Sequence, residues 1–312
     1  MGCTGFVGGT LSRQRQFDGL YHSRNIDEIA GQSFDMVVCA AAPATMWAAN
    51  QNPEADKANL DRLADVLTRV NVGNFVLIST IAVFDNPAAG YTEASAVYET
   101  QKAYGRHRRQ LEERFAAHFP RCHVLRLPAL FGPGLKKNFI FDLMNPLPSF
   151  IKPDRFDETA SAFSPADAAL LRRWYALDAA LGMWALDRAG LAASPDSPAL
   201  TAAFEAIGFV SRNFTNSASR FQYYNMARLA VDIDTVVGAG LAAVNICSEP
   251  LEAATIAREL TGQAFANDGP PQVAEDMRSD HAALFGGSGP YLFGREAVLA
   301  DLKAFYTAQT AT

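Results

Sequence analysis

The sequence lacks the features that mark membrane, secreted and metal-binding proteins. It has no charged-then-apolar leader and no apolar run of about 18 residues, so neither secretion nor membrane spanning is indicated. Its 5 histidines form no H-E-x-x-H pattern and its 4 cysteines have no metal-ligand spacing, so no metal site is predicted. The cysteines lie within or beside apolar stretches, which predicts reduced, packed thiols in a cytoplasmic protein.

Positive charge is also scarce. The formal net charge is -6, and the short basic cluster at residues 106–109 is followed by Glu112 and Glu113. This balance argues against a nucleic-acid partner. A chain of 312 residues with 49% hydrophobic residues can nevertheless bury a large core, which suits a two-lobed enzyme or two domains.

Three glycines open the chain at a spacing typical of dinucleotide binding. Gly2, Gly5 and Gly8 form a G-x-x-G-x-x-G pattern. A side chain at the first would block the tight turn, one at the second would hold the backbone off a pyrophosphate, and one at the third would push the next helix off the sheet. Free N–H groups at the start of that helix would face the anion. The pattern alone is also compatible with an ordinary glycine-rich turn.

Only Met1 precedes this turn, whereas a dinucleotide-binding turn follows a buried apolar strand. In a doubly wound sheet that strand is central. Its absence predicts a gap in the sheet, with unpaired backbone groups beside it. We therefore expect the natural start of the chain to lie upstream.

Strands and helices alternate after the glycine turn. Continuous apolar runs predict strands at 17–23, 36–42, 74–80 and 122–131, and apolar residues at helical spacing predict helices at 53–71 and 104–117. This order predicts an α/β fold with a Rossmann-type, doubly wound parallel sheet.

The periodicity changes after Gly132-Pro133-Gly134. The Ala- and Leu-rich residues 165–193 predict one or two helices, and 199–207 predict another. A strand at 242–247 and a helix at 251–260 return to the α/β pattern.

The change in pattern divides the chain into two parts. We predict a dinucleotide-binding domain at residues 1–133 plus about 224–247. The remainder, 134–223 and 248–312, is predicted to form a smaller, mainly helical substrate lobe.

Several short segments of roughly the first 145 residues occur together in the order found in one enzyme family. They are the glycine turn, Cys39-Ala40-Ala41-Ala42, residues 79–84, Tyr104-Gly105 with Glu112, and Leu130-Phe131-Gly132-Pro133-Gly134. In this the chain resembles the extended short-chain dehydrogenase/reductase superfamily, in particular the NAD-dependent epimerase/dehydratase group, which acts mostly on nucleotide sugars.

The resemblance implies a catalytic set of a hydroxyl residue, a tyrosine and a lysine. It places Thr80 in the hydroxyl role and Tyr104 in the acid/base role, while Arg108 stands at the lysine position. A nearby cation would favour the phenolate, although arginine and lysine are not equivalent donors. A literal Y-x-x-x-K also occurs at Tyr98 and Lys102, but the family's Tyr-Gly start with a glutamate eight residues on favours Tyr104.

The cofactor implied is NAD or NADP. No carboxylate occurs after the second predicted strand until Asp27, and Arg24 stands nearby, which favours NADP slightly. The expected cofactor contacts are Gly2, Gly5, Phe6, Val7, Gly8, Ser23, Arg24, Asn25, Ala40 and Ala41.

The family places substrate contacts after the last core strand. This implies Asn138, with Lys136 and Lys137 as phosphate-neutralising residues. The later arginine motif of the family is missing, unless Arg220 serves.

The implied activity is hydride transfer at a sugar carbon, leading to epimerisation, dehydration or reduction of a small-molecule substrate, in particular a nucleotide sugar. Neither a nucleic acid nor a membrane is expected as a partner, and a homodimer is the assembly to test. The alternative is a non-catalytic NAD(P)-binding sensor or scaffold protein. The presence of Arg108 at the position of the family's lysine favours this alternative.

Overall fold

The computed structural model describes residues 1–179 and 181–311, and the chain forms two compact units. The first unit comprises Met1–Leu135, Arg220–Glu252 and Val273–Ala308. The second comprises Lys136–Ser219, Ala253–Gln272 and Gln309–Thr312. The division differs from the predicted one at the C-terminal end, where 273–308 join the first unit because Met277 and Leu292 are buried in its core.

A parallel sheet forms the centre of the first unit. Four strands pair in the order β1-β2-β3-β10: β1 (Ser33–Cys39), β2 (Asn71–Thr80), β3 (Cys122–Leu127) and β10 (Ala243–Asn245). The register places Val37 opposite Phe75, and Leu77 opposite Val124. Every pair in this sheet is parallel.

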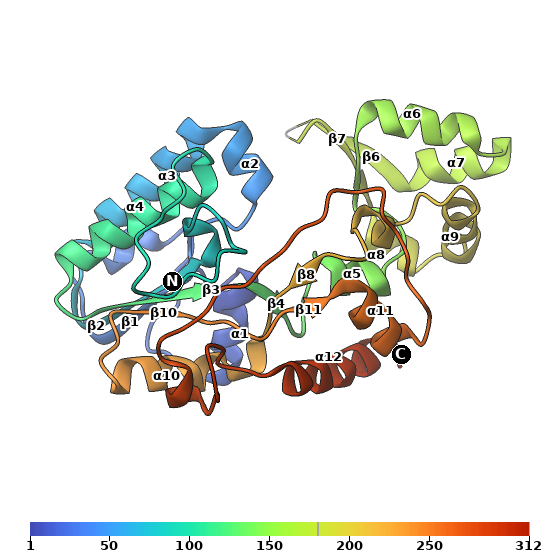
Figure 1. The fold of residues 1–312 in the computed structure, drawn as a ribbon. Helices are drawn as coiled ribbons and strands as arrows, with labels where there is room; N and C mark the ends of the chain where they lie inside the picture. The colour runs from blue at the N-terminus through green and yellow to red at the C-terminus, as the bar shows by residue number, and fades with distance from the viewer. Residues whose placement is uncertain (180, 312) are drawn as a thin grey trace. The chain divides into compact units, whose positions relative to one another are not determined.

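Helices cover both faces of this sheet, as Figure 1 shows. Side chains alternate between the faces along each strand. On one face they pack with α3 (Pro53–Leu67) and α4 (Ala103–His118). On the other they pack with α1 (Phe6–Gln14) and α10 (Leu229–Gly238). The predicted α/β fold with a doubly wound parallel sheet is therefore confirmed.

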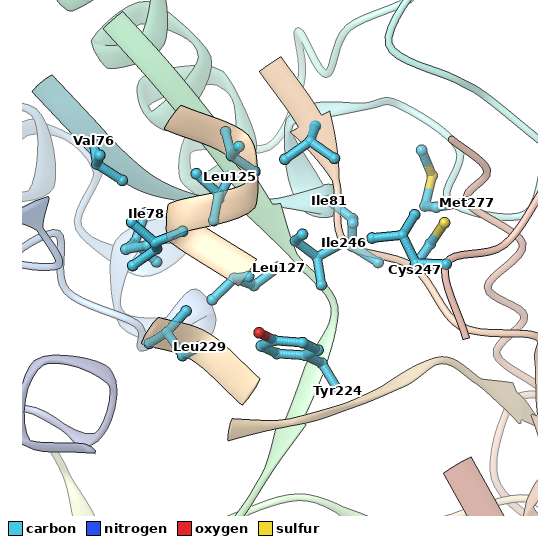
Figure 2. Close-up of a cluster of buried hydrophobic side chains, with 14 of the residues drawn as sticks. Val76, Ile78, Ile81, Leu125, Leu127, Tyr224, Leu229, Ile246, Cys247 and Met277 are labelled. Atoms are coloured by element: carbon cyan, nitrogen blue, oxygen red, sulfur yellow. The ribbon is translucent and has the colours of Figure 1, made fainter. Parts of the chain in front are cut away.

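A cluster of buried hydrophobic residues, on the face of the sheet that α1 and α10 cover, joins distant parts of the chain. Ile78 of β2 and Leu125 of β3 lie with Leu229 of α10, and Met277 lies beside Cys247 (Figure 2). Cys39, Cys122 and Cys247 are buried, and all four cysteines are free thiols. The apolar sequence around them predicted reduced, packed thiols.

The remaining elements of the first unit are short, apart from a C-terminal helix. They are α2 (Met46–Gln51), β4 (Ala129–Phe131), β8 (Arg220–Phe221), β9 (Tyr223–Asn225), β11 (Leu251–Glu252) and α12 (Arg295–Thr310), with 3-10 helices at Ile26–Ile29, Ile81–Val83, Met226–Arg228 and Ala282–Phe285. β4 pairs with β9 and β11 with β8. The strand predicted at 122–131 is divided into β3 and β4 at Pro128, which has no N–H for a ladder.

The second unit contains helices and one small antiparallel sheet. Its helices are α5 (Phe139–Met144), α6 (Pro153–Ala162), α7 (Pro165–Trp174), α8 (Arg188–Ala192), α9 (Ser197–Ala206), α11 (Ala253–Thr261) and the 3-10 helix Ser211–Phe214. The sheet order is β5-β7-β6, with β5 (Phe150–Ile151), β6 (Tyr175–Asp178) and β7 (Met183–Leu186).

The prediction of helices alone at 165–193 was therefore wrong. After α7 the chain forms the pair β6 and β7, in which Leu177 lies opposite Trp184. Trp184 stacks on Phe156 of α6, with ring centroids 3.9 Å apart. Packing of this kind overrides the helix preference of Ala, Leu and Met.

Residues 17–23 form no strand, contrary to the prediction. β1 is the outer strand of the sheet, and a small pocket of about 60 Å³ is lined by residues of β1, α1 and 17–21. Met1 stands at one end of this space: its N-terminus donates to Val38 O (2.9 Å), and the next residue, Gly2, donates to Tyr21 O (2.8 Å).

No helix among residues 1–179 and 181–311 has the length and apolar character needed to cross a membrane.

Candidate functional site

The glycine turn is closed by its own backbone. Gly2 has φ +78°, a conformation that favours glycine. Gly5 N–H donates to Gly2 O (3.0 Å), and Gly9 N–H donates to Gly5 O (2.8 Å). Gly5 is the N-cap of α1 and supplies no side chain, so the first N–H groups of the helix are available to an anion.

The three glycines differ in how closely they are packed. A Cβ on Gly2 would lie 2.3 Å from Ala40 O, and one on Gly8 would lie 2.1 Å from Gly2 O. A Cβ on Gly5 would meet only Gly2 O, at 3.4 Å. Gly2 and Gly8 are therefore required by the fold itself, whereas the space beside Gly5 is open, as a ligand site needs.

Several of the expected cofactor contacts lie close to this turn. Ala40 N–H donates to Met1 O (3.2 Å), which brings the end of β1 to Gly2. Residues 23–25 follow Tyr21, whose carbonyl accepts from Gly2. Asn25 Oδ1 accepts from the backbone N–H of His22 (2.8 Å) and shapes this turn, while Arg24 is exposed. Phe6 and Val7 form the first turn of α1, where both are partly buried.

Thr80 and Tyr104 are brought together in the first unit. Thr80 is the last residue of β2, and Tyr104 is in the first turn of α4, where only 9% of it is exposed. The Thr80 hydroxyl lies close enough to the Tyr104 phenol to lower its pKa. Tyr104 N–H donates to Asn50 Oδ1 (2.9 Å), which fixes the start of the helix.

The glycine after Tyr104 explains how α4 comes this close. A Cβ on Gly105 would lie 2.0 Å from Ala82 O, in the short helix that follows Thr80. The Tyr-Gly pair is thus a packing requirement that sets the phenol beside the Thr80 hydroxyl. Sequence reasoning used this pair as a family feature and missed its physical cause.

Burial raises the pKa of the Tyr104 phenol in this ligand-free protein. The positive charge of Arg108 and the Thr80 hydroxyl act in the opposite direction, and the negative charge of Asp56 adds to the increase. The net direction is opposite to the lowering expected from a cation alone, because the desolvated phenolate is the costlier form.

Arg108 is held by an ion pair that the sequence did not reveal. Nη1 and Nη2 donate to Asp56 Oδ2 and Oδ1 (2.6 and 2.9 Å), and Nη2 also donates to Pro43 O (2.6 Å). The guanidinium carbon lies 4.0 Å from the centroid of the Tyr104 ring. The terminal nitrogens are thus engaged within the protein.

Tyr98 has different surroundings. Its ring stacks on Phe84 at 5.6 Å, and the guanidinium of Arg109 lies 3.9 Å from its centroid. Lys102, its partner in the literal Y-x-x-x-K, is the residue before α4. Tyr98 therefore packs among rings and cations.

A buried network fixes α4 to the sheet. Glu112 accepts from Ser79 Oγ (2.6 Å) and from Arg126 Nη2 (2.8 Å) of the neighbouring strand. All three side chains are buried. Because Ser79 precedes Thr80 and Glu112 lies two turns after Tyr104, the network sets the register between the two candidate residues. Arg126 was missed because nothing near it in sequence shows its partner.

The expected substrate residues Lys136, Lys137 and Asn138 lie at the start of the second unit. Asn138 has φ +115°, and its Oδ1 accepts from Ile140 N (3.0 Å) and Phe141 N (3.2 Å), so it caps α5. Burial lowers the pKa of Lys137, which is therefore not a fully solvated lysine.

Asp142 was not predicted as a site residue. Burial raises the pKa of its carboxyl to about 7, against the lowering effect of the Arg188 charge. No group of three His, Cys, Asp or Glu suited to a metal ion occurs in the part of the chain that the structure describes.

Known proteins share this fold and part of this sequence. The family model described as the RmlD substrate binding domain matches residues 8–149. No curated protein matches the sequence.

Solved structures resemble almost the whole chain. RMD from Pseudomonas aeruginosa complexed with NADPH has a TM-score of 0.55 and 16% identity, covering 97% of both chains. A dTDP-4-dehydrorhamnose reductase from Yersinia enterocolitica has 0.58 and 12%, covering 98% of this chain and 96% of its own. A UDP-glucose 4-epimerase from Thermotoga maritima with UDP-glucose has 0.56 and 14%, covering 100% and 98%. At these identities the likeness shows the fold.

Proposed function

We propose that the chain belongs to the extended short-chain dehydrogenase/reductase superfamily and is an NAD(P)-dependent enzyme that transfers hydride at a carbon of a nucleotide sugar. The match of residues 8–149 to the RmlD substrate binding domain supports this proposal. The observation that carries the proposal is the placement of the Thr80 hydroxyl beside the Tyr104 phenol, in the same unit as the glycine turn. The reductases and the epimerase of similar fold support this reaction class.

The residues present fit a dinucleotide. The open space beside Gly5 and the start of α1 suit a pyrophosphate, and Ala40 and Ala41 line the approach from β1. When bound, the nicotinamide supplies or accepts the hydride. The first unit thus serves as the cofactor domain of this proposal, and the second, with Lys136, Lys137 and Asn138, as the substrate lobe.

Thr80 and Tyr104 handle the proton of the substrate hydroxyl. The Thr80 hydroxyl orients the substrate oxygen and Tyr104. Tyr104 donates a proton to that oxygen during reduction and accepts one during oxidation. A tyrosine has an ordinary pKa of about 10 and burial raises that of Tyr104, so the protein presents the protonated phenol that reduction requires at neutral pH.

Ultraviolet absorbance of the reduced nicotinamide tests the proposal. We would incubate the purified protein with NADPH or NADH and a panel of nucleotide sugars and their 4-keto forms. Consumption of the reduced cofactor with one sugar would support a reductase, and conversion without net consumption would support an epimerase. No conversion of any sugar, despite measurable dinucleotide binding, would instead support a non-catalytic NAD(P)-binding protein, which the engaged terminal nitrogens of Arg108 favour.

A substitution of Arg24 tests the proposed slight preference for NADP over NAD. Changing Arg24 to Ser should weaken NADPH binding roughly three- to tenfold and leave NADH binding unchanged, because an exposed cation contributes modestly to binding a phosphate. Calorimetric titration with both cofactors gives the ratio. Arg69→Ser, an exposed arginine after α3, is the matched control, and equal losses for NADPH and NADH would contradict the assignment.

A further inference from the structure

Resting on the proposed function, we propose that Asp56 is a positioning residue for the acid/base site. In this assignment it engages the terminal nitrogens with which Arg108 would otherwise reach a ligand, and it offsets part of the positive charge that this arginine places beside the Tyr104 ring. Asp56 lies in the first turn of α3, away from every sequence motif of the chain. Its side chain is 5% exposed and that of Arg108 is 3% exposed.

The contact is bidentate and leaves little freedom. Both carboxylate oxygens of Asp56 accept from Arg108, at 2.6 and 2.9 Å, which is the geometry that arginine offers and lysine does not. His107 Nδ1 lies 2.9 Å from Asp56 Oδ2, so the carboxylate is held from two residues of α4. Burial disfavours ionisation of Asp56, but the hydrogen bonds from Arg108 and His107 outweigh it and lower its pKa.

The pair connects three elements around the proposed cofactor site. Asp56 belongs to α3 and Arg108 to α4, while Pro43, whose carbonyl accepts from Nη2 (2.6 Å), follows the end of β1. Arg108 Nη1 also donates to Tyr104 O (3.3 Å) in its own helix. The guanidinium bound at these points lies over the Tyr104 ring, with its central carbon 4.0 Å from the ring centroid.

The pair also determines how much positive charge Tyr104 experiences. The charged groups that act on the phenol are Arg108 from α4 and Asp56 from α3, and they act in opposite directions. An arginine paired in this way favours the phenolate less than an unpaired lysine would. Asp56 thus offsets part of the effect of the cation at the lysine position.

The decisive experiment follows the ionisation of Tyr104 in the ligand-free protein. Isotope-labelled tyrosine NMR, with Tyr104→Phe to assign the signal, gives its titration in wild type and in Asp56→Asn. We expect the Tyr104 signal of Asp56→Asn to titrate at lower pH than in wild type, because a negative charge facing the phenol is removed. Asp61→Asn is the matched control on the same helix, where Asp61 pairs with Lys57 at the surface.

A second pair of variants keeps the test decisive if Asp56→Asn alone folds poorly. Arg108→Lys is compared with Asp56→Asn/Arg108→Lys, and the double variant should again titrate at the lower pH. A titration that is unchanged or moved to higher pH in both comparisons, together with a reduced Tm, would overturn the proposal and leave Asp56 a structural residue.

The measurement needs neither cofactor nor substrate, so it is independent of the proposed reaction. If wild type binds no dinucleotide, the proposed function fails while the titration still decides the role of Asp56. In an active enzyme, the limb of the kcat–pH profile that reports Tyr104 should move in the same direction.

Discussion

Replacing Tyr104 with Phe should lower turnover by at least about 10²-fold, the usual contribution of a general acid or base. The change removes one hydroxyl and keeps the ring under the Arg108 guanidinium, so cofactor affinity and Tm should remain close to wild type. Steady-state kinetics and calorimetry on the same preparations measure both. In wild type, the rate of the oxidation direction should increase with pH, because the phenol, whose pKa burial raises, must lose its proton.

Tyr98→Phe is the matched control. Tyr98 packs against Phe84 and Arg109, and its loss of a hydroxyl should change turnover little. A larger loss for Tyr98→Phe than for Tyr104→Phe would transfer the acid/base role to Tyr98 and Lys102. Equal, small losses would show that neither phenol takes part in proton transfer.

Changing Gly5 to Val should weaken dinucleotide binding by at least about a hundredfold while the fold is retained. Gly5 has φ -81°, which any residue adopts, and the nearest atom to an added Cβ is Gly2 O at 3.4 Å. The added side chain would occupy the space where a pyrophosphate must approach the backbone. Calorimetric affinity, with Tm as a check on the fold, measures the effect.

Gly8→Ala provides the contrast. Its Cβ would lie 2.1 Å from Gly2 O, so the turn must shift, at a cost of about 1–3 kcal/mol in the free energy of unfolding. Gly8→Ala should thus lower Tm, whereas Gly5→Val should lower binding. Unchanged affinity in Gly5→Val would contradict the cofactor site.

The central sheet could be predicted because its strands are continuous apolar runs. Residues 74–80 lie within β2 and 104–117 within α4, since burial on both faces of a sheet, or on one face of a helix, leaves a period in the sequence. Residues 17–23 and the β6–β7 pair were predicted wrongly because their conformation depends on a neighbour. Residues 17–23 contact the glycine turn, where Gly2 N–H donates to Tyr21 O, and the β6–β7 pair is held by strand pairing within the second unit.

For the same reason, the sequence could predict only part of the candidate site. Thr80 and Tyr104 stand beside recognisable segments, but Asp56 has no motif and lies 52 residues from Arg108. Its contact follows from the packing of α3 on α4, which sequence spacing does not record. Only the fold shows that the arginine at the lysine position has a partner.

Three separate segments of the chain form the first unit, and their order affects how the protein folds during its synthesis. The last strand of the sheet, β10, comes long after β3, and Met277 and Leu292 reach the core only with residues 273–308. A nascent chain that has completed β3 therefore still has an open sheet edge and an uncovered apolar surface. Ribosome pausing or cleavage within the second unit would leave a fragment suited to recognition by chaperones and proteases, so intact chain length is a condition for the first unit to fold.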